Sequence, residues 1–237
     1  MGAINALEHT DRDYEQELRR LREQLLVMGS RVENLIGESL RALEERDHAL
    51  AQRTIAADLV INQLELEIDS ACLRILARRQ PVASDLRFIA IALKVVTDLE
   101  RMGDLGVNIC ERVMELSSEP TLKPLLDLPR MAEETRTMLR ESLDALVARD
   151  AVRAQAVIER DHLVDALYAQ LFSELLSHMS DNPRHVYRAT RLASIGKYLE
   201  RIADHATNVA EMVVFMVRGQ DVRHLGGREG VCAVAPH

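Results

Sequence analysis

The chain contains the segment LERMGDLGVNICE at residues 99–111 and repeats it, without a gap, as LERIADHATNVAE at residues 199–211. Six of the thirteen aligned residues are identical, and each lies 100 residues from its match. Matches continue upstream as Arg46-Asp47 with Arg149-Asp150, Ala51-Gln52 with Ala154-Gln155, and Asp58 with Asp161. Self-similarity at a long and nearly constant interval is the signature of a repeated structural unit. The sequence therefore predicts a tandem duplication.

Each unit is predicted to be helical because its apolar residues recur with a helical period. In the first helix they are spaced alternately three and four apart, at Leu18, Leu21, Leu25, Met28, Val32 and Leu35. No window shows the sustained alternation of a strand. We therefore predict an all-α protein, a tandem duplication of two three-helix bundles with six long helices. These run from Tyr14 to Arg46, Asp47 to Arg78, Pro81 to Ser117, Leu128 to Arg149, Asp150 to Met179 and Pro183 to Val217.

Proline and glycine positions predict the domain boundaries. Pro120, Pro124 and Pro129 cluster between the two units, where proline interrupts helices because it lacks the amide donor. Four of the 10 glycines, Gly219, Gly226, Gly227 and Gly230, follow the last helix. We predict a first bundle at residues 1–120, a second at 121–218, and a flexible C-terminal tail at 219–237.

Composition limits the classes of partner. The 237 residues carry a net charge of −8 with only 3% aromatic residues, a poor basis for binding nucleic acid. No apolar run is long enough to span a bilayer, so we expect no direct membrane insertion. The three cysteines, Cys72, Cys110 and Cys232, are odd in number and form no CxxC pair. They predict neither a disulfide framework nor a cysteine-rich zinc site, and we expect a cytoplasmic protein in which Cys72 and Cys110 lie in the core.

The duplicated segment places oxygen-bearing side chains on one helix face. At about 100° per residue, its acidic and amide residues span roughly 80° of arc, opposite an apolar face. They are Glu100, Asp104, Asn108 and Glu111 in the first copy, and Glu200, Asp204, Asn208 and Glu211 in the second. The preceding helices carry a matching set, Asp58, Asn62, Glu65 and Asp69 in one half and Asp161 and Asp165 in the other. Antiparallel packing would bring the two sets together across a groove.

Carboxylates that converge from two helices need a cation, a proton or an arginine to neutralise them. An all-oxygen set suits Mg²⁺, Mn²⁺ or iron. Arg101 and Arg201 are alternative neutralisers, or residues for docking a partner. A single Glu-x-x-x-Asp pair is usually an ordinary solvated face. Its duplication, together with Asn108 and Asn208, favours a metal-related or oxyanion-related role. His205 aligns with Leu105, which predicts a surface or auxiliary residue and not an essential ligand.

Two segments resemble the PhoU family, the accessory regulators of bacterial phosphate transport. They are RQPVASDLRF at residues 79–88 with DLERMGD at 98–104, and YLERIADHATNVAE at 198–211. The resemblance covers roughly residues 10–218 and implies that acidic motifs bind metal ions on the bundle surface. It carries that role to Glu100, Asp104, Glu200, Asp204, Asp58, Asp161 and Asp165. Asn62 stands where the family has an acid, Leu105 replaces a common His, and the glycine-rich tail lies outside the family pattern.

The resemblance also implies a function. Proteins of this family are not enzymes: they couple the ATPase subunit of the phosphate importer to a phosphate-sensing histidine kinase, and they repress the phosphate-starvation response when phosphate is plentiful. The implied partners are that ATPase subunit and that kinase, and the implied ligands are divalent or iron ions, with Mg, Mn, Fe and Zn left open. We also expect a homodimer, because long helical bundles with much surface often pair.

Two alternatives compete with this interpretation. A ferritin-like dimetal carboxylate enzyme needs a Glu-x-x-His pair on each of two helices. The chain has Glu45 with His48 and Glu159 with His162, but the pairs are not equivalent in the repeat and the first spans a predicted turn. A helical scaffold without ligand is the second alternative. Tyr14, Phe88, Phe172 and Phe215 are predicted to serve packing only.

Overall fold

The computed structural model describes residues 2–81, 83–122 and 127–219, with the side chains of residue 12 onward. Six α-helices and one 3₁₀ turn make up the described chain, which contains no strand. They are α1 (Gly2–Glu45), α2 (His48–Arg78), α3 (Ala83–Leu116), α4 (Asp127–Ala148), α5 (Ala151–Asp181), η1 (Pro183–His185) and α6 (Val186–Arg218). The all-α prediction with six long helices is confirmed.

Equivalent turns separate the first two helices of each half. Arg46 and Arg149 adopt left-handed backbone angles, with φ of 56° and 52°. The next residue caps the following helix: Asp47 accepts a hydrogen bond from the Leu50 amide at 2.9 Å, and Asp150 accepts one from the Val152 amide at 2.9 Å. These bonds to exposed helix amides lower the pKa of both carboxyls. The Arg-Asp repeat is therefore the sequence of a turn.

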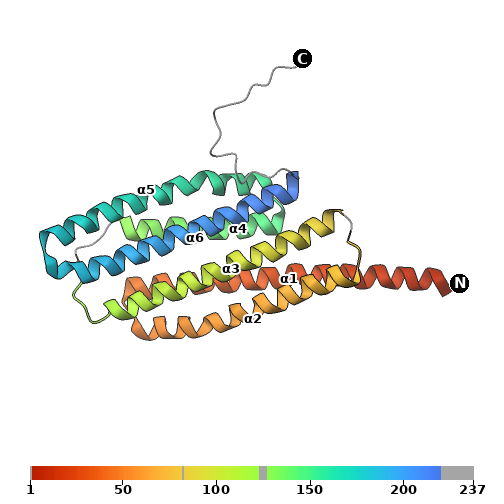
Figure 1. The fold of residues 1–237 in the computed structure, drawn as a ribbon, viewed down its shortest axis with the longest axis horizontal. Coiled ribbons are helices and arrows are strands. Elements are labelled where there is room, and N and C mark those ends of the chain that lie inside the picture. Colours follow the sequence, from red (N-terminus) through yellow and green to blue (C-terminus); the bar gives the residue numbers. More distant parts are fainter. Residues whose placement is uncertain (1, 82, 123–126, 220–237) are drawn as a thin grey trace, which may run out of the picture.

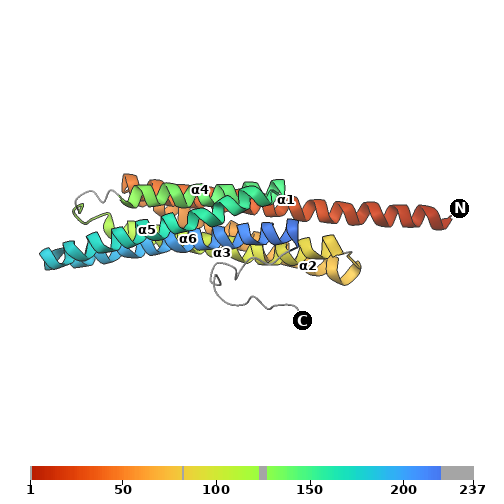
Figure 2. The same cartoon turned by 90° about the horizontal axis from the view of Figure 1, so that it is seen from above.

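Two helix starts differ from the prediction. The first helix begins at Gly2 and not at Tyr14, and Figure 1 and Figure 2 show it projecting beyond the other helices. Apolar spacing located only the part that packs, whereas a helix can continue past its packing partners. The sixth helix begins as a 3₁₀ turn at Pro183, where Asn182 accepts a hydrogen bond from the Arg184 amide at 3.0 Å.

The helices form two layers. Helices α5, α6, α3 and α2 lie side by side in one layer, and α1 and α4 lie behind them (Figure 1, Figure 2). Within each half all three helices pack together, and the halves join where α3 packs on α6 and α1 packs on α4. The interface between halves is therefore continuous with the two bundle cores. The predicted division of the chain at residues 120 and 218 stays a prediction, and residues 220–237 of the expected tail lie outside the described residues.

The repeated third helices supply much of the core. Their predicted inner faces are fully buried, at Val95, Leu99, Met102 and Ile109 in α3 and Ile195, Leu199, Ile202 and Val209 in α6. Cys72 and Cys110 are buried as predicted, and burial raises the pKa of each thiol to about 12. Phe172 packs less completely than predicted, because the residue is 41% exposed on α5, where the centre of its ring lies 6.1 Å from the centre of the Tyr168 ring. Among the described helices, none is both long and apolar enough to cross a bilayer.

Candidate metal sites

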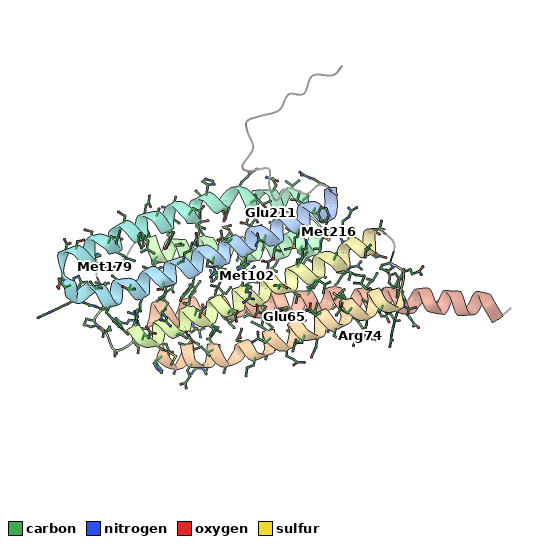
Figure 3. The ribbon with its side chains drawn as sticks, in the orientation of Figure 1. Glu65, Arg74, Met102, Met179, Glu211 and Met216 are labelled. Atoms are coloured by element: carbon green, nitrogen blue, oxygen red, sulfur yellow. The ribbon has the colours of Figure 1, made fainter. Side chains whose placement is uncertain are left out.

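The two acidic stripes lie at equivalent helix pairs, α2 with α3 and α5 with α6. The acids of α3 face those of α2, and the acids of α6 face those of α5, as antiparallel packing predicts. We name Asp58, Asn62, Glu65, Glu100 and Asp104 the first acidic cluster, and Asp161, Asp165, Glu200 and Asp204 the second. Figure 3 places Glu65 along the middle of α2, where α2 and α3 run side by side. Tertiary packing thus places each predicted metal ligand near at least one acid of the neighbouring helix.

Asp58 is the most deeply placed acid of the first acidic cluster. It is 9% exposed, and its Oδ2 accepts a hydrogen bond from Asn62 Nδ2 at 2.9 Å. Asp58 Oδ1 and Asn62 Oδ1 are buried without a hydrogen-bond partner in the described structure. A Cβ at Gly103 would come within 3.0 Å of Asp58 Oδ1, so the glycine leaves space beside this oxygen. Two buried acceptors without donors are suited to contact a cation.

Burial and mutual repulsion disfavour the charged forms of this cluster. Burial raises the pKa of Asp58, the Asn62 hydrogen bond lowers it, and the charge of Asp104 raises it. Burial likewise raises the pKa of Glu65 and Glu100, and Asp104 adds to both effects. Asp104 therefore interacts with acids of both helices, and Glu65 on α2 also raises the pKa of Glu100 on α3 directly. A bound cation would reverse these shifts.

Arg101 partly neutralises the first cluster, as expected. Its Nε lies 3.5 Å from Glu100 Oε2, and its Nη1 lies 3.5 Å from Asp104 Oδ2. The arginine side chain is 58% exposed, so these ion pairs are weak. A metal ion could therefore displace Arg101 from Glu100 and Asp104 at a small cost in free energy.

The second acidic cluster repeats this arrangement with four acids. Burial raises the pKa of Asp161. The charges of Asp165 and Glu200 raise it further, whereas the Thr207 hydroxyl lowers it. Although Asp204 is exposed as a whole residue, loss of water around its carboxyl raises its pKa to about 6. The charges of Glu200, Asp161 and Asp165 contribute, and Lys197 opposes them. Because Asp165 stands where the first cluster has Asn62, the second cluster is the more anionic at this position.

The neutralising residue of the second cluster is Lys197 and not Arg201. Lys197 Nζ forms an ion pair with Glu200 Oε2 and lies 5.5 Å from the centre of the Tyr168 ring. Arg201 is exposed and forms no ion pair within the described part of the chain. Sequence analysis missed Lys197 because it aligns with Thr97 in the other half. Its position three residues before Glu200 on a helix was the available signal.

The auxiliary residues do not lie where the stripe predicted. Asn208 Nδ2 donates to Asp98 Oδ1 at 3.2 Å, and His205 Nδ1 lies 2.7 Å from the same oxygen. Both bonds cross from α6 to α3, so His205 is a half-buried bridging residue and not a surface residue. Asn108 makes no side-chain hydrogen bond to other described residues. Asn108 and Asn208 align in the repeat, but they do not make equivalent contacts in the two halves.

The donor type fits a hard cation, but the side chains are not arranged as a finished metal centre. Across residues 2–81, 83–122 and 127–219, no three acidic, histidine or cysteine side chains stand together around one ion position. The fit rests on the partnerless oxygens of Asp58 and Asn62 and on the oxygen-only donor set. The residues that could hold an ion are Asp58, Asn62, Glu100 and Asp104 in one half, and Asp161, Asp165, Glu200 and Asp204 in the other.

The ferritin-like alternative has no support in the geometry. Glu45 ends α1 and His48 begins α2, and both are exposed. Glu159 and His162 are exposed on α5, where the His162 ring nitrogen meets the Glu159 carbonyl oxygen at 2.5 Å. A dimetal carboxylate site requires such pairs to project into a bundle core. These pairs point to solvent instead.

The fold and the clusters define a duplicated three-helix-bundle protein with one acidic cluster in each half. Comparison with family models finds the PhoU domain twice, at residues 25–113 and 128–213. The chain belongs to the PhoU family. The two matches fall on the two halves, which confirms the duplication.

Individual relatives agree over nearly the whole chain. The phosphate-specific transport system accessory protein PhoU homolog of Pseudomonas putida is 40% identical over 219 residues, covering 92% of this chain and 86% of the relative. The PhoU accessory protein of Escherichia coli strain K12 is 34% identical, covering 97% and 95% of the two chains. The crystal structure of PhoU from Pseudomonas aeruginosa superimposes with a TM-score of 0.85 at 38% identity, covering 87% of this chain and all of that one. These names describe accessory proteins, not enzymes.

Proposed function

We propose that this protein is a cytoplasmic accessory subunit of phosphate transport that couples the ATPase subunit of a phosphate importer to a phosphate-sensing histidine kinase. In this role it modulates phosphate uptake and represses the phosphate-starvation response when phosphate is plentiful. The names of its relatives, phosphate-specific transport system accessory proteins, support the transport role. The observation that carries the proposal is an acidic cluster between two helices at the equivalent place in each half, which both halves could use for the same kind of ligand.

The ligand of each acidic cluster is proposed to be a metal ion. Asp58, Asn62, Glu100 and Asp104 would hold it in the first cluster, and the four carboxylates of the second cluster would hold it in the other. An ion bound there would neutralise acids that otherwise repel one another and would link α2 to α3 and α5 to α6. The oxygen donors favour Mg²⁺, Mn²⁺ or iron, and zinc remains within the proposal.

Metal content of variants tests this role directly. Purified protein should be stripped with a chelator, reloaded with each candidate ion, and analysed for metal per chain. Asp104→Asn and Asp204→Asn should each lower the metal content, and the double variant should lose most of it while its helical circular dichroism is unchanged. Asp144→Asn, at an exposed acid of α4, is the matched control. An unchanged metal content in the double variant would remove the metal proposal and leave the transport role standing.

The partner proposal needs its own experiment. The full-length protein should be captured with the purified importer ATPase subunit and with the sensor kinase, each at high and at low phosphate. We expect binding to both, with a dependence on phosphate for at least one. Loss of both interactions would contradict the coupling role independently of the metal result.

A ligand-free scaffold is the second candidate function. The observation that favours it is that Arg101 and Lys197 already neutralise part of each cluster. This candidate predicts that the Asp104→Asn, Asp204→Asn double variant regulates phosphate uptake as the unchanged protein does. It also predicts no saturable metal binding.

A further inference from the structure

An apolar cavity of about 320 Å³ lies where the two halves of the protein meet, at the end of the bundle opposite the N-terminus (Figure 1). Leu40 of α1 and Val113 of α3 line it from the first half, and Leu128 of α4 and Leu192 of α6 line it from the second. Leu122, between the halves, also lines it. Small-molecule sites of this size occur preferentially at such junctions and are lined mostly by apolar side chains. A ligand of this cavity must therefore be largely apolar.

Two arginines, one from each half, also lie on the cavity wall. Arg46 donates hydrogen bonds to the carbonyl oxygens of Leu116 and Glu119, and Arg188 Nη1 donates to the carbonyl oxygen of Pro120 at 2.8 Å. These carbonyl oxygens hold the two guanidinium groups in place, but they do not cancel the positive charges. Among the described residues, neither arginine forms an ion pair. The cavity wall therefore carries two half-buried cations without an acidic partner.

A neighbouring arginine shows that the missing acidic partner is not general at this end of the bundle. Arg191, about one helical turn after Arg188, pairs its Nε with Glu115 Oε2 at 2.7 Å. Arg188 Nε is instead buried with no hydrogen-bond acceptor in the described part of the chain. Glu44 is the one acid among the described residues of the cavity wall, and it is exposed and pairs with neither arginine. The net positive charge of the wall favours an anionic group on the ligand.

We propose that this cavity binds a small amphipathic carboxylate, such as a medium-chain fatty acid. Its alkyl chain lies among the leucines, and its carboxylate accepts hydrogen bonds from Arg188 and Arg46. Arginine suits this ligand because its planar guanidinium group donates paired, charge-assisted hydrogen bonds to a carboxylate. Inorganic phosphate alone fits poorly, because it has no apolar part to contact the walls and would lose hydration among them.

The carboxylate site is separate from the two acidic clusters, since none of the residues on the cavity wall belongs to either cluster. Residues 123–126, which connect Leu122 to α4, lie outside the described residues and are no part of the proposed site. Because the ligand contacts helices of both halves, it stabilises the junction between them. Loading the cavity should therefore raise the thermal midpoint of the chain whether or not a metal ion is bound.

Isothermal titration calorimetry of the full-length protein tests the site, after treatment with a chelator and removal of co-purified lipid. The probes are butyrate, hexanoate, octanoate and decanoate, each below the concentration at which it forms micelles. We expect one ligand per chain and an affinity that rises by about fourfold with each added CH₂ until the cavity is filled. Octanol has the same chain length without the charge, and it should bind at least about tenfold more weakly than octanoate because it lacks the charge-assisted hydrogen bonds.

Two pairs of variants separate the charged part of the site from the apolar part. Arg188→Gln should weaken octanoate binding by about tenfold or more and leave octanol binding nearly unchanged. Arg130→Gln removes the same charge from an exposed position of α4 outside the cavity, and it should change octanoate binding by less than about twofold. Ala132→Leu narrows the cavity and should weaken both ligands by at least about tenfold, whereas Ala169→Leu, exposed on α5, should weaken neither. Circular dichroism checks that all four variants are helical, and Leu192→Phe replaces Ala132→Leu if that variant unfolds.

Absence of saturable octanoate binding to the unchanged protein would overturn the proposal. Binding that neither Arg188→Gln nor Ala132→Leu weakens would also overturn it, since the ligand would then lie elsewhere on the surface. Displacement of octanoate by inorganic phosphate at comparable concentration would show that the wall selects an anion alone and not an amphipathic carboxylate. If the unchanged protein binds no carboxylate and Ala132→Leu loses binding to the importer ATPase subunit, the cavity receives an apolar side chain of that partner instead.

Discussion

Asp98 Oδ1 on α3 lies 2.7 Å from His205 Nδ1 on α6, and this contact ties the first half of the protein to the second. Asn208 donates to the same oxygen at 3.2 Å. The equivalent residues in the repeat are Tyr198 and Leu105, so no second copy of the bridge exists. Asp98 lies two residues before Glu100 and His205 follows Asp204. The bridge therefore joins the two helices that each carry part of an acidic cluster.

Asp98→Ala should lower the free energy of unfolding by about 1–2 kcal/mol, because it leaves the half-buried His205 ring nitrogen and the exposed Asn208 amide on α6 without this partner. Urea denaturation at neutral pH measures the effect. Glu15→Gln, at an exposed acid of α1, should change stability by less than about 0.5 kcal/mol. Equal stability of both variants would show that the bridge contributes nothing.

Asp204→Asn should stabilise the metal-free protein at neutral pH. The pKa of Asp204 is raised to about 6 in the folded state, so its protonated form favours folding. That contribution is fully present below the unfolded pKa near 3.8 and is lost as pH rises through about 6. With allowance for solvent screening at this exposed residue, we expect about 1 kcal/mol of stabilisation at about pH 7.5 and none at about pH 4. Chelator-treated protein in urea gives the comparison, and a pH-independent difference would argue against the shifted carboxyl.

Lys197→Gln should strengthen metal binding at the second cluster by about three- to tenfold, because an incoming cation no longer competes with the lysine for Glu200. Isothermal titration with Mn²⁺ measures the affinity. Arg201→Gln removes a charge of the same sign from the neighbouring surface without breaking an ion pair, and it should have a smaller effect. Equal changes in Mn²⁺ affinity in the two variants would indicate that the net charge of the surface sets the affinity, and not competition between Lys197 and the metal ion for Glu200.

Gly106→Ala should destabilise the protein by about 1–2 kcal/mol, because a Cβ at this position would clash with Leu35 Cδ2 in the packed α1–α3 interface. Gly37→Ala is the matched control on α1, where an added Cβ meets nothing within 4 Å. The control should gain about 0.5–1 kcal/mol from better helix propensity. Thermal unfolding followed by circular dichroism distinguishes the two signs.

Arg149→Gly and Arg46→Gly should have opposite effects, although both residues hold the same left-handed turn. Glycine relieves the backbone cost at φ of 52° in Arg149, which should stabilise the protein by about 0.5–1 kcal/mol. Arg46 also donates to the carbonyl oxygens of Leu116, which ends α3, and of Glu119, and to Thr121 Oγ1 at 2.6 Å. In Arg46→Gly, the stability lost with these hydrogen bonds should exceed the stability gained by relieving the backbone conformation. A stabilised Arg46→Gly variant would show that the bonds carry no net stability.

Much of the fold could be predicted from local sequence, because helix period and turn chemistry act over a few residues. The spacing of Leu18 through Leu35, the Arg46-Asp47 turn and its repeat, and the buried faces of α3 and α6 were all predictable. The first helix was placed too late because residues before Tyr14 lack the apolar period from which packing is recognised. Phe172 was misplaced because an aromatic residue at helical spacing does not reveal whether a neighbour covers it.

The sequence by itself determined the duplication, the six helices and the acidic face of each third helix, since these depend on order and spacing along the chain. Only the tertiary structure decided which residues oppose those acids. It paired Glu200 with Lys197 and left Arg201 in solvent, turned His205 and Asn208 toward Asp98, and left Asp58 Oδ1 and Asn62 Oδ1 without donors. These outcomes depend on how helices distant in sequence are rotated and aligned against one another, and side-chain spacing within one helix carries no information about that rotation.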